Sequence, residues 1–170
     1  MEPEEELLAL LDPQSGEAVL EVGCGLGKLT KALVERGCLV TAIDPDEASL
    51  EQARLIAPLA NFVCAGLLEY ENQQAFDAIV SRGALHWIRP SAQVPAHLYG
   101  LLKASGRLAA EWGGCVREFT DDAWLPSPGE VACALEAVGF QVRLVVCYDE
   151  DRGRAPRVRV LAVKAESENH

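Results

Sequence analysis

The chain has 170 residues, and its 26 acidic residues against 15 Lys and Arg give a formal net charge of −11 at pH 7. This length predicts one domain over residues 1–170 with frayed ends at 1–3 and 165–170, and the 49% of hydrophobic residues excludes disorder over most of it. The acidic balance argues against a nucleic-acid partner, because proteins that bind phosphate backbones are usually basic. With neither an apolar run of about 18 residues nor a signal-peptide pattern, we expect a cytoplasmic protein with no membrane partner.

Short apolar runs alternate with amphipathic segments along the first two thirds of the chain, which is typical of an α/β fold with a mostly parallel sheet. Strands covered on both faces read as nearly continuous apolar runs. The predicted strands are Ala18–Val22, Cys38–Ile43, Asn61–Cys64, Phe76–Ser81 and Arg107–Trp112. The predicted helices between them are Lys28–Arg36, which Gly37 ends, Glu47–Ala57 and Val94–Lys103.

The last third carries a helix followed by two strands. Ser127 is a predicted N-cap whose capping box Glu130 closes, and Gly139 ends the helix. The apolar runs Phe140–Tyr148 and Arg157–Lys164 are joined by too short a connection for a parallel crossover, so they are expected to pair antiparallel. The sequence therefore predicts a seven-stranded sheet that ends in an antiparallel hairpin.

The six cysteines could form three disulfides, but several lie inside apolar runs and no signal peptide precedes them. We expect reduced packing residues at Cys24, Cys38, Cys64, Cys115, Cys133 and Cys147. The sequence has no CxxC pair and no Cys/His cluster at zinc spacing, so it predicts no metal site.

A glycine-rich turn joins the first predicted strand to the helix that follows it. Gly23, Gly25 and Gly27 stand in GxGxG spacing, which suits a sharp bend where a ligand approaches bare backbone at a helix N-terminus. Glu21 precedes the first glycine by two residues and suits a ligand ammonium, whereas it would repel a pyrophosphate. The pattern favours S-adenosylmethionine (SAM), which has an amino-acid head and no phosphate, over a nicotinamide cofactor, whose loops have GxGxxG spacing.

An acidic residue, Asp44, ends the second predicted strand. An acid at this position can accept hydrogen bonds from both ribose hydroxyls of an adenosine. The alternative is that Asp44 only caps the helix that follows it.

These motifs, in this order, resemble the class I SAM-dependent methyltransferases across about residues 5 to 164. The matching segments are Glu21–Gly27, Ala42–Pro45, Phe76–Ser81, Leu101–Leu108 and Glu130–Phe140. Ala84–Ile88 further resembles the small-molecule branch that includes trans-aconitate methyltransferases. The resemblance implies a Rossmann-like sandwich, SAM as cofactor with S-adenosylhomocysteine (SAH) as product, and methyl transfer to a small-molecule acceptor.

The resemblance also implies roles for single residues. Glu21 and the backbone of Gly23 and Ser81 would hold the methionine head, while Asp44 would hold the ribose, with Pro45 beside the adenine. The remaining expected cofactor contacts are Cys24, Gly25, Gly27, Gly66 and Leu67.

Leu67 departs from the family, which often has an Asp here that reaches the adenine amino group. That hydrogen bond is either missing or supplied by the backbone or Glu69. We expect cofactor binding to be weakened by about 1 kcal/mol, the usual net contribution of one hydrogen bond.

The segment after the fourth predicted strand is the expected acceptor side, because open sheets bind ligands at the carboxyl ends of their strands. His86 is the candidate general base, and Arg82 or Arg89 could pair a substrate carboxylate. The alternative is that His86 packs the loop against the sheet and the arginines are solvated. Methyl transfer does not require a base where donor and nucleophile are aligned.

Two further segments have open interpretations. Glu111–Gly114 either borders the acceptor pocket or forms a tight structural turn. The hairpin arginines resemble an anion site, but a solvated hairpin is the preferred interpretation in an acidic protein; they are Arg152, Arg154, Arg157 and Arg159.

Little of the chain remains for a lid over the acceptor. Only Glu4–Leu11 precedes the first strand region, and Cys115–Leu125 is the one long loop left. Three hypotheses follow: the substrate is large, a second copy or a partner protein completes the pocket, or the chain is a SAM-binding module that regulates a partner without efficient catalysis.

Overall fold

The computed structural model of the protein describes residues 3–72, 74–113, 126–148 and 157–166. Its elements in chain order are α1 (Pro3–Leu11), β1 (Ala18–Val22), α2 (Lys28–Glu35), β2 (Leu39–Asp44), α3 (Glu47–Ile56), β3 (Asn61–Cys64), β4 (Phe76–Arg82), the 3₁₀ turns η1 (Leu85–Trp87) and η2 (Ser91–Gln93), α4 (Val94–Leu101), β5 (Leu102–Gly113), α5 (Pro128–Glu136), β6 (Phe140–Tyr148) and β7 (Arg157–Lys164).

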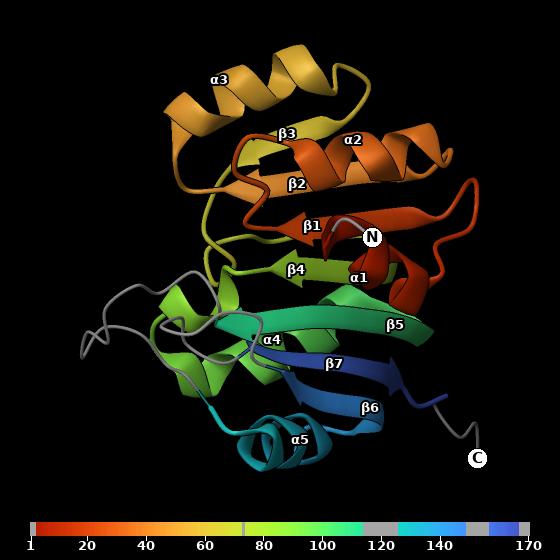
Figure 1. Cartoon of the computed structure of the whole chain (residues 1–170), viewed down its shortest axis with the longest axis vertical. Helices are drawn as coiled ribbons and strands as arrows, with labels where there is room; N and C mark the ends of the chain where they lie inside the picture. Colours follow the sequence, from red (N-terminus) through yellow and green to blue (C-terminus); the bar gives the residue numbers. More distant parts are fainter. Residues whose placement is uncertain (1–2, 73, 114–125, 149–156, 167–170) are drawn as a thin grey trace.

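The seven strands form one sheet in the order β3-β2-β1-β4-β5-β7-β6 (Figure 1). Strands β1 to β5 pair in parallel, whereas β7 runs antiparallel to both β5 and β6. The predicted sheet and its terminal hairpin are thus confirmed. Strand order reverses between β1 and β4, and such a switch point is where open α/β sheets leave a crevice at their carboxyl ends. The arrowheads of β1, β4 and β5 all point to that edge in Figure 1.

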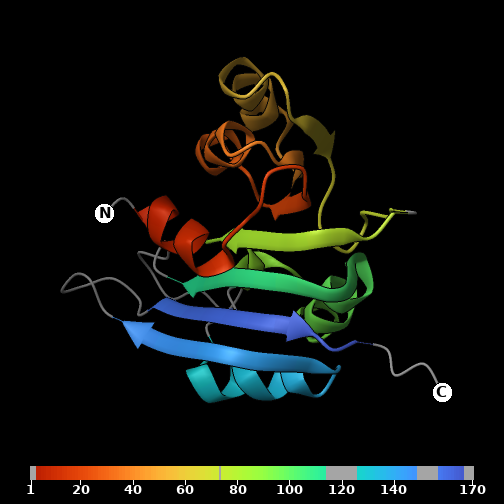
Figure 2. The ribbon, with the colours of Figure 1, turned by 90° about the vertical axis from the view of Figure 1, so that its right-hand side faces the viewer.

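Helices cover both faces of the sheet. Figure 2 shows α1, α2 and α3 on one side and α4 and α5 on the other. Buried Leu7 of α1, Leu33 of α2 and Leu50 of α3 belong to one apolar core with the sheet, while Leu98 of α4 and Leu135 of α5 belong to the other. Burial of these two apolar layers is the main stabilising contribution to the sandwich.

Helix ends are set by local side chains and by glycine. The predicted capping box is present, because Ser127 accepts from the backbone N–H of Glu130 and the Glu130 side chain accepts from that of Ser127. Gly37 follows α2 with a left-handed φ of 82°, as expected of a helix stop. The cap of α3 is Asp46, whose side chain accepts from the N–H of Ala48.

The predicted boundary between Val94–Lys103 and the fifth strand is wrong. Helix α4 ends at Leu101, and β5 already begins at Leu102, which is buried and pairs with Phe76 of β4. The apolar side chain of Leu102 fits a helix stripe and a strand equally well, so periodicity alone does not separate them. Among the described helices, none is long and apolar enough to cross a membrane.

Candidate functional site

The glycine turn after β1 is built by close packing at two of its glycines. Gly23, Gly25 and Gly27 have left-handed φ angles of 74°, 50° and 83°. A Cβ at Gly23 would overlap the Cβ of Ala84, and one at Gly27 would lie 2.9 Å from the Cβ of Ala53. At Gly25 no described atom lies within 4 Å of that position, so this is the glycine that leaves room for a ligand to approach the backbone.

Asp44 ties the end of β2 to the glycine turn. One carboxylate oxygen accepts from the Gly25 N–H at 2.9 Å, and the other accepts from the Asp46 N–H at 2.9 Å. The N–H of Gly23 donates to the Ile43 carbonyl at 2.8 Å. The N-cap of α3 is Asp46 rather than Asp44, and Asp44 lies at the carboxyl end of β2, where it lines a hollow.

Glu21 is buried beneath the turn at 2% exposure. Its carboxyl accepts a hydrogen bond from the Thr30 hydroxyl at 2.5 Å. Burial raises the pKa of Glu21 to about 8, with the hydrogen bond from Thr30 opposing this rise and the nearby Asp44 adding to it. The carboxyl is therefore largely protonated at pH 7, and a cation placed beside it would favour the ionised form.

Two hollows open at the carboxyl edge of the sheet. The larger has a volume of about 460 Å³ and a mostly apolar wall. It is lined by Val22, Gly23, Ile43, Asp44, Pro45, Ala65, Gly66, Leu67, Leu68, Glu69, Gly83, Ala84, Trp87, Ile88 and Arg89. The smaller, of about 240 Å³, is lined by Glu4, Glu21, Gly23, Cys24, Gly25, Leu26, Lys28, Leu29 and Arg82. Gly23 belongs to both hollows, so they meet at the glycine turn.

Most of the predicted cofactor residues thus gather around these two hollows. Gly27 and Ser81 do not line either one: Gly27 packs against Ala53, and the Ser81 hydroxyl donates to the Val22 carbonyl at 2.9 Å. Leu67 lines the larger hollow with its side chain 2% exposed. The Glu69 carboxylate lies against Gly66 on the same wall.

The cysteines of the described segments carry no disulfide, but the expected packing role is wrong at Cys64, Cys133 and Cys147, which are exposed. Cys24, within the glycine turn, is buried at 7% exposure. Burial, together with the nearby Glu21 and Asp44, raises the pKa of the Cys24 thiol to about 12. The thiol is therefore protonated at neutral pH, which suits a packing residue. Cys115 lies outside the described residues.

His86 lies in η1 and is fully buried. The N–H of Gly113 donates to its Nδ1 at 3.3 Å, so the neutral ring carries its proton on Nε2, for which the described residues supply no hydrogen-bond partner. Burial, followed by the positive charge of Arg89, lowers the pKa of His86 to about 4. His86 lines neither hollow, although its neighbours Trp87 and Arg89 line the larger one.

The expected solvated hairpin is wrong at two of its arginines. Arg157 and Arg159 are only 6% and 8% exposed. The reason is strand register: β7 lies beside β5 with Arg159 opposite Glu111, and oppositely charged residues at such cross-strand positions stabilise each other. The other two hairpin arginines, at 152 and 154, and the loop 115–125 lie outside the described residues.

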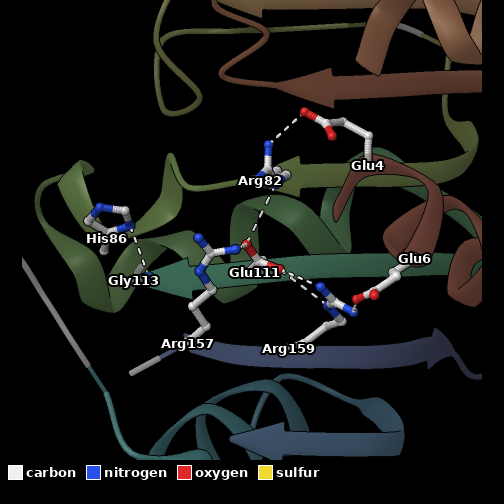
Figure 3. A network of polar contacts seen from close by, with 8 residues as sticks. All are labelled: Glu4, Glu6, Arg82, His86, Glu111, Gly113, Arg157 and Arg159. Carbon is white, nitrogen blue, oxygen red and sulfur yellow. Dashed lines mark hydrogen bonds and ion pairs between the residues drawn. The ribbon is translucent and has the colours of Figure 1, made fainter. Parts of the chain in front are cut away.

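Glu111 is the centre of a polar network and lies within β5, so of the two interpretations of this segment the tight turn does not hold at Glu111. Arg159 contacts the Glu111 carboxylate at 2.8 Å and Arg157 at 3.5 Å, while Arg82 of β4 lies 3.7 Å from it. Figure 3 shows Glu111 between Arg82 on one side and the two β7 arginines on the other.

Helix α1 completes this network. Arg82 pairs with Glu4 at 2.8 Å, and Arg159 pairs with Glu6 at 2.9 Å (Figure 3). This contact has no signal in the sequence, because three consecutive glutamates at 4–6 indicate only a favourable acidic first turn of a helix. Arg82 is therefore engaged by protein carboxylates at the place where a substrate contact was expected.

Comparison with known proteins gives a consistent result. A family model described as "Methyltransferase domain" matches residues 19–106. Trans-aconitate 2-methyltransferase from Enterobacter sp. (strain 638) is 34% identical over 111 residues, which are 64% of this chain and 44% of that protein. The chain therefore spans less than half the length of that relative.

Solved structures show the same architecture. The N-methyltransferase NodS from Bradyrhizobium japonicum WM9, in complex with SAH, has a TM-score of 0.81 at 18% identity, covering 97% of this chain and 87% of that one. Magnesium protoporphyrin IX methyltransferase (ChlM) from Synechocystis PCC 6803 has a TM-score of 0.78 at 20% identity, covering 95% and 78%. At these identities the likeness establishes the fold alone.

Proposed function

Since the chain belongs to the class I SAM-dependent methyltransferases, we propose that it binds SAM and transfers the methyl group to a small-molecule acceptor. The observation that carries the proposal is the pair of unlike hollows that meet at Gly23. One is mostly apolar with a carboxylate at its edge, and the other is lined by several charged side chains and a buried acid. These are the chemistries that the two ends of SAM require.

The larger hollow suits the adenosine end. Its apolar wall, formed in part by Ile43, Pro45 and Leu67, can cover the base. Asp44 is the carboxylate in reach of a ribose, and the Gly25 N–H holds its orientation at 2.9 Å. An adenosine volume fits comfortably within about 460 Å³, which lies in the usual range of ligand pockets.

The smaller hollow suits the amino-acid end. Glu21 supplies a carboxyl for the ammonium, and Gly25 leaves its backbone open to an approaching ligand. With the two ends held on either side of Gly23, the reactive sulfur would lie over the turn, close to Gly83 and Ala84 of the β4 end. This is the edge at which an acceptor can approach in line.

SAM supplies an activated methyl group, so that the acceptor forms its bond to the methyl carbon as the carbon–sulfur bond breaks and SAH leaves. The residues of this chain contribute positioning and exclusion of water, which account for much of the catalysis in such a transfer. We assign His86 to holding the β4–η1 connection against the end of β5. Its burial, its bond from Gly113 and its lowered pKa support that role over general-base catalysis.

The chemical class of acceptor that we propose, a carboxylic acid, is taken by analogy from a relative. Trans-aconitate 2-methyltransferase is named for a carboxylic acid, and Arg89 at the mouth of the larger hollow is a side chain suited to a carboxylate. The test is transfer of a radiolabelled methyl group from SAM to a panel of carboxylic acids, amines and phenols. Methyl transfer to one of these acceptor classes supports the proposal. The His86→Ala variant is expected to retain this activity.

A second candidate is a SAM-binding module that acts through a partner or a second copy. The pairing of Arg82 with Glu4 and Glu111 favours it, because an arginine predicted to bind the acceptor is held by protein carboxylates instead. Binding of SAH without methyl transfer to any member of the panel would support this candidate and contradict the enzymatic one.

A further inference from the structure

The side chain of Glu4 places a carboxylate of the protein itself at the smaller hollow. The hollow is lined by Glu4 together with Glu21, Arg82 and Lys28. Glu4 and Arg82 form an ion pair of 2.8 Å, with side chains 18% and 27% exposed. Lys28 has an exposed side chain, so Arg82 is the cation that the fold holds in a defined position in this hollow.

Arg82 is oriented by a second carboxylate that does not depend on Glu4. Its Nε lies 3.7 Å from Glu111, which is itself 1% exposed and held by Arg159 at 2.8 Å. Removal of Glu4 from Arg82 would therefore leave the guanidinium in place, with its free edge directed at the hollow. Figure 3 shows Glu4 and Glu111 on opposite sides of Arg82.

The first turn of α1 is attached by charge, whereas the rest of the helix is attached by apolar packing. Leu7, Leu8 and Leu11 are at most 1% exposed. An ion pair with partly exposed side chains contributes little to stability, because water competes for both partners. Glu4 can therefore leave Arg82 while α1 stays docked through its leucines.

We propose that Glu4 occupies the position of a ligand carboxylate at Arg82, and that the α-carboxylate of the cofactor displaces it on binding. The inference rests on the proposed function, because it takes the amino-acid end of SAM or SAH as the ligand. That end carries one ammonium and one carboxylate, and the hollow offers Glu21 for the first and Arg82 for the second. Cofactor binding is thereby coupled to release of Glu4 from Arg82, while Glu5 and Glu6 of the same turn keep their own ion pairs.

The test is calorimetric titration of SAH into the whole chain and its Glu4→Gln variant. Removal of the internal competitor is expected to tighten SAH binding about two- to fivefold, the factor that corresponds to a partly exposed ion pair. Glu5→Gln is the matched control, since Glu5 is the next residue of α1 but pairs with Arg36, outside the hollow. The control is expected to bind SAH as the unmodified chain does.

Two further measurements separate this inference from the proposed function. Methylthioadenosine has the adenosine and the sulfur but no amino-acid end, so Glu4→Gln is expected to leave its affinity unchanged. Arg82→Gln is expected to weaken SAH binding and to abolish the effect of Glu4→Gln, with Arg82→Lys as an intermediate that keeps the charge if the Gln variant does not fold.

Unchanged or weaker SAH binding by Glu4→Gln, in a chain that does bind SAH, would overturn the displacement and leave the proposed function standing. Equal tightening of methylthioadenosine would also overturn it, because the effect would then not involve the carboxylate. Failure of the unmodified chain to bind either ligand would overturn the proposed function and the inference together.

Discussion

Burial of a single carboxyl, Glu21, makes the site sensitive to pH. Glu21 is 2% exposed, and its pKa rises from 4.5 to about 8 because burial disfavours the charged form. The folded state therefore keeps a proton that the unfolded chain loses above about pH 4.5. Stability contributed by this group is fully present below that pH and is lost as the pH rises through about 8.

We predict that Glu21→Gln removes this loss. The unmodified chain should become less stable between pH 6 and pH 9 relative to Glu21→Gln, because the amide has no proton to lose in that range. Urea denaturation at the two pH values measures the difference. Parallel pH dependence of the two proteins would show that Glu21 is ionised in the folded state, contrary to our account.

The same residues show the limits of sequence reasoning. The positions of Glu21, before the glycine turn, and of Asp44, at the end of β2, single out both acids in the sequence, and each lines one of the two hollows. The Glu21–Thr30 hydrogen bond was not foreseen, because Thr30 reaches Glu21 only through the turn of α2. The sequence also does not identify Asp46 as the N-cap of α3, since Asp44 and Asp46 are the same residue type and are equally suited to cap a helix.

Among the elements, β5, β7 and α1 depend on one buried carboxylate, Glu111. It faces Arg159 across the sheet and also contacts Arg157 and Arg82. Arg82 and Arg159 in turn hold α1 through Glu4 and Glu6. The sequence predicts β7 closely, whereas β5 begins five residues earlier than predicted. The sequence does not predict the antiparallel register of β5 and β7. This register places Arg159 opposite Glu111.

We predict that Glu111→Ala lowers the free energy of unfolding by about 3 kcal/mol or more, because it leaves buried guanidinium groups without their shared partner. Glu47→Ala is the control: Glu47 pairs with Arg54 at 2.6 Å, but both side chains are largely exposed, so a loss below about 1 kcal/mol is expected. Chemical denaturation of both variants tests this. Equal losses would mean that the Glu111 network contributes no more than a surface pair.

At the scale of the whole molecule, the chain has a net charge of −11, yet three of its arginines are gathered at one place in the sheet. Arg82, Arg157 and Arg159 meet a single carboxylate of the sheet, Glu111, at the edge where the hollows open. Glu4 and Glu6 of α1 supply two further negative charges, which pair with Arg82 and Arg159. Composition gives only the average charge of the chain, which argues against classes of partner. The local charge around Glu111 depends instead on which arginines the sheet topology brings together.

On the proposed function, the two hollows joined at Gly23 form one SAM site. Calorimetric titration of the unmodified chain with SAH tests it most directly, with NAD as the comparison ligand. We predict one SAH bound per chain and no binding of NAD, with a dissociation constant of about a micromolar or weaker because Leu67 cannot accept a hydrogen bond from the adenine amino group. Absence of SAH binding, or binding of NAD in its place, would contradict the account.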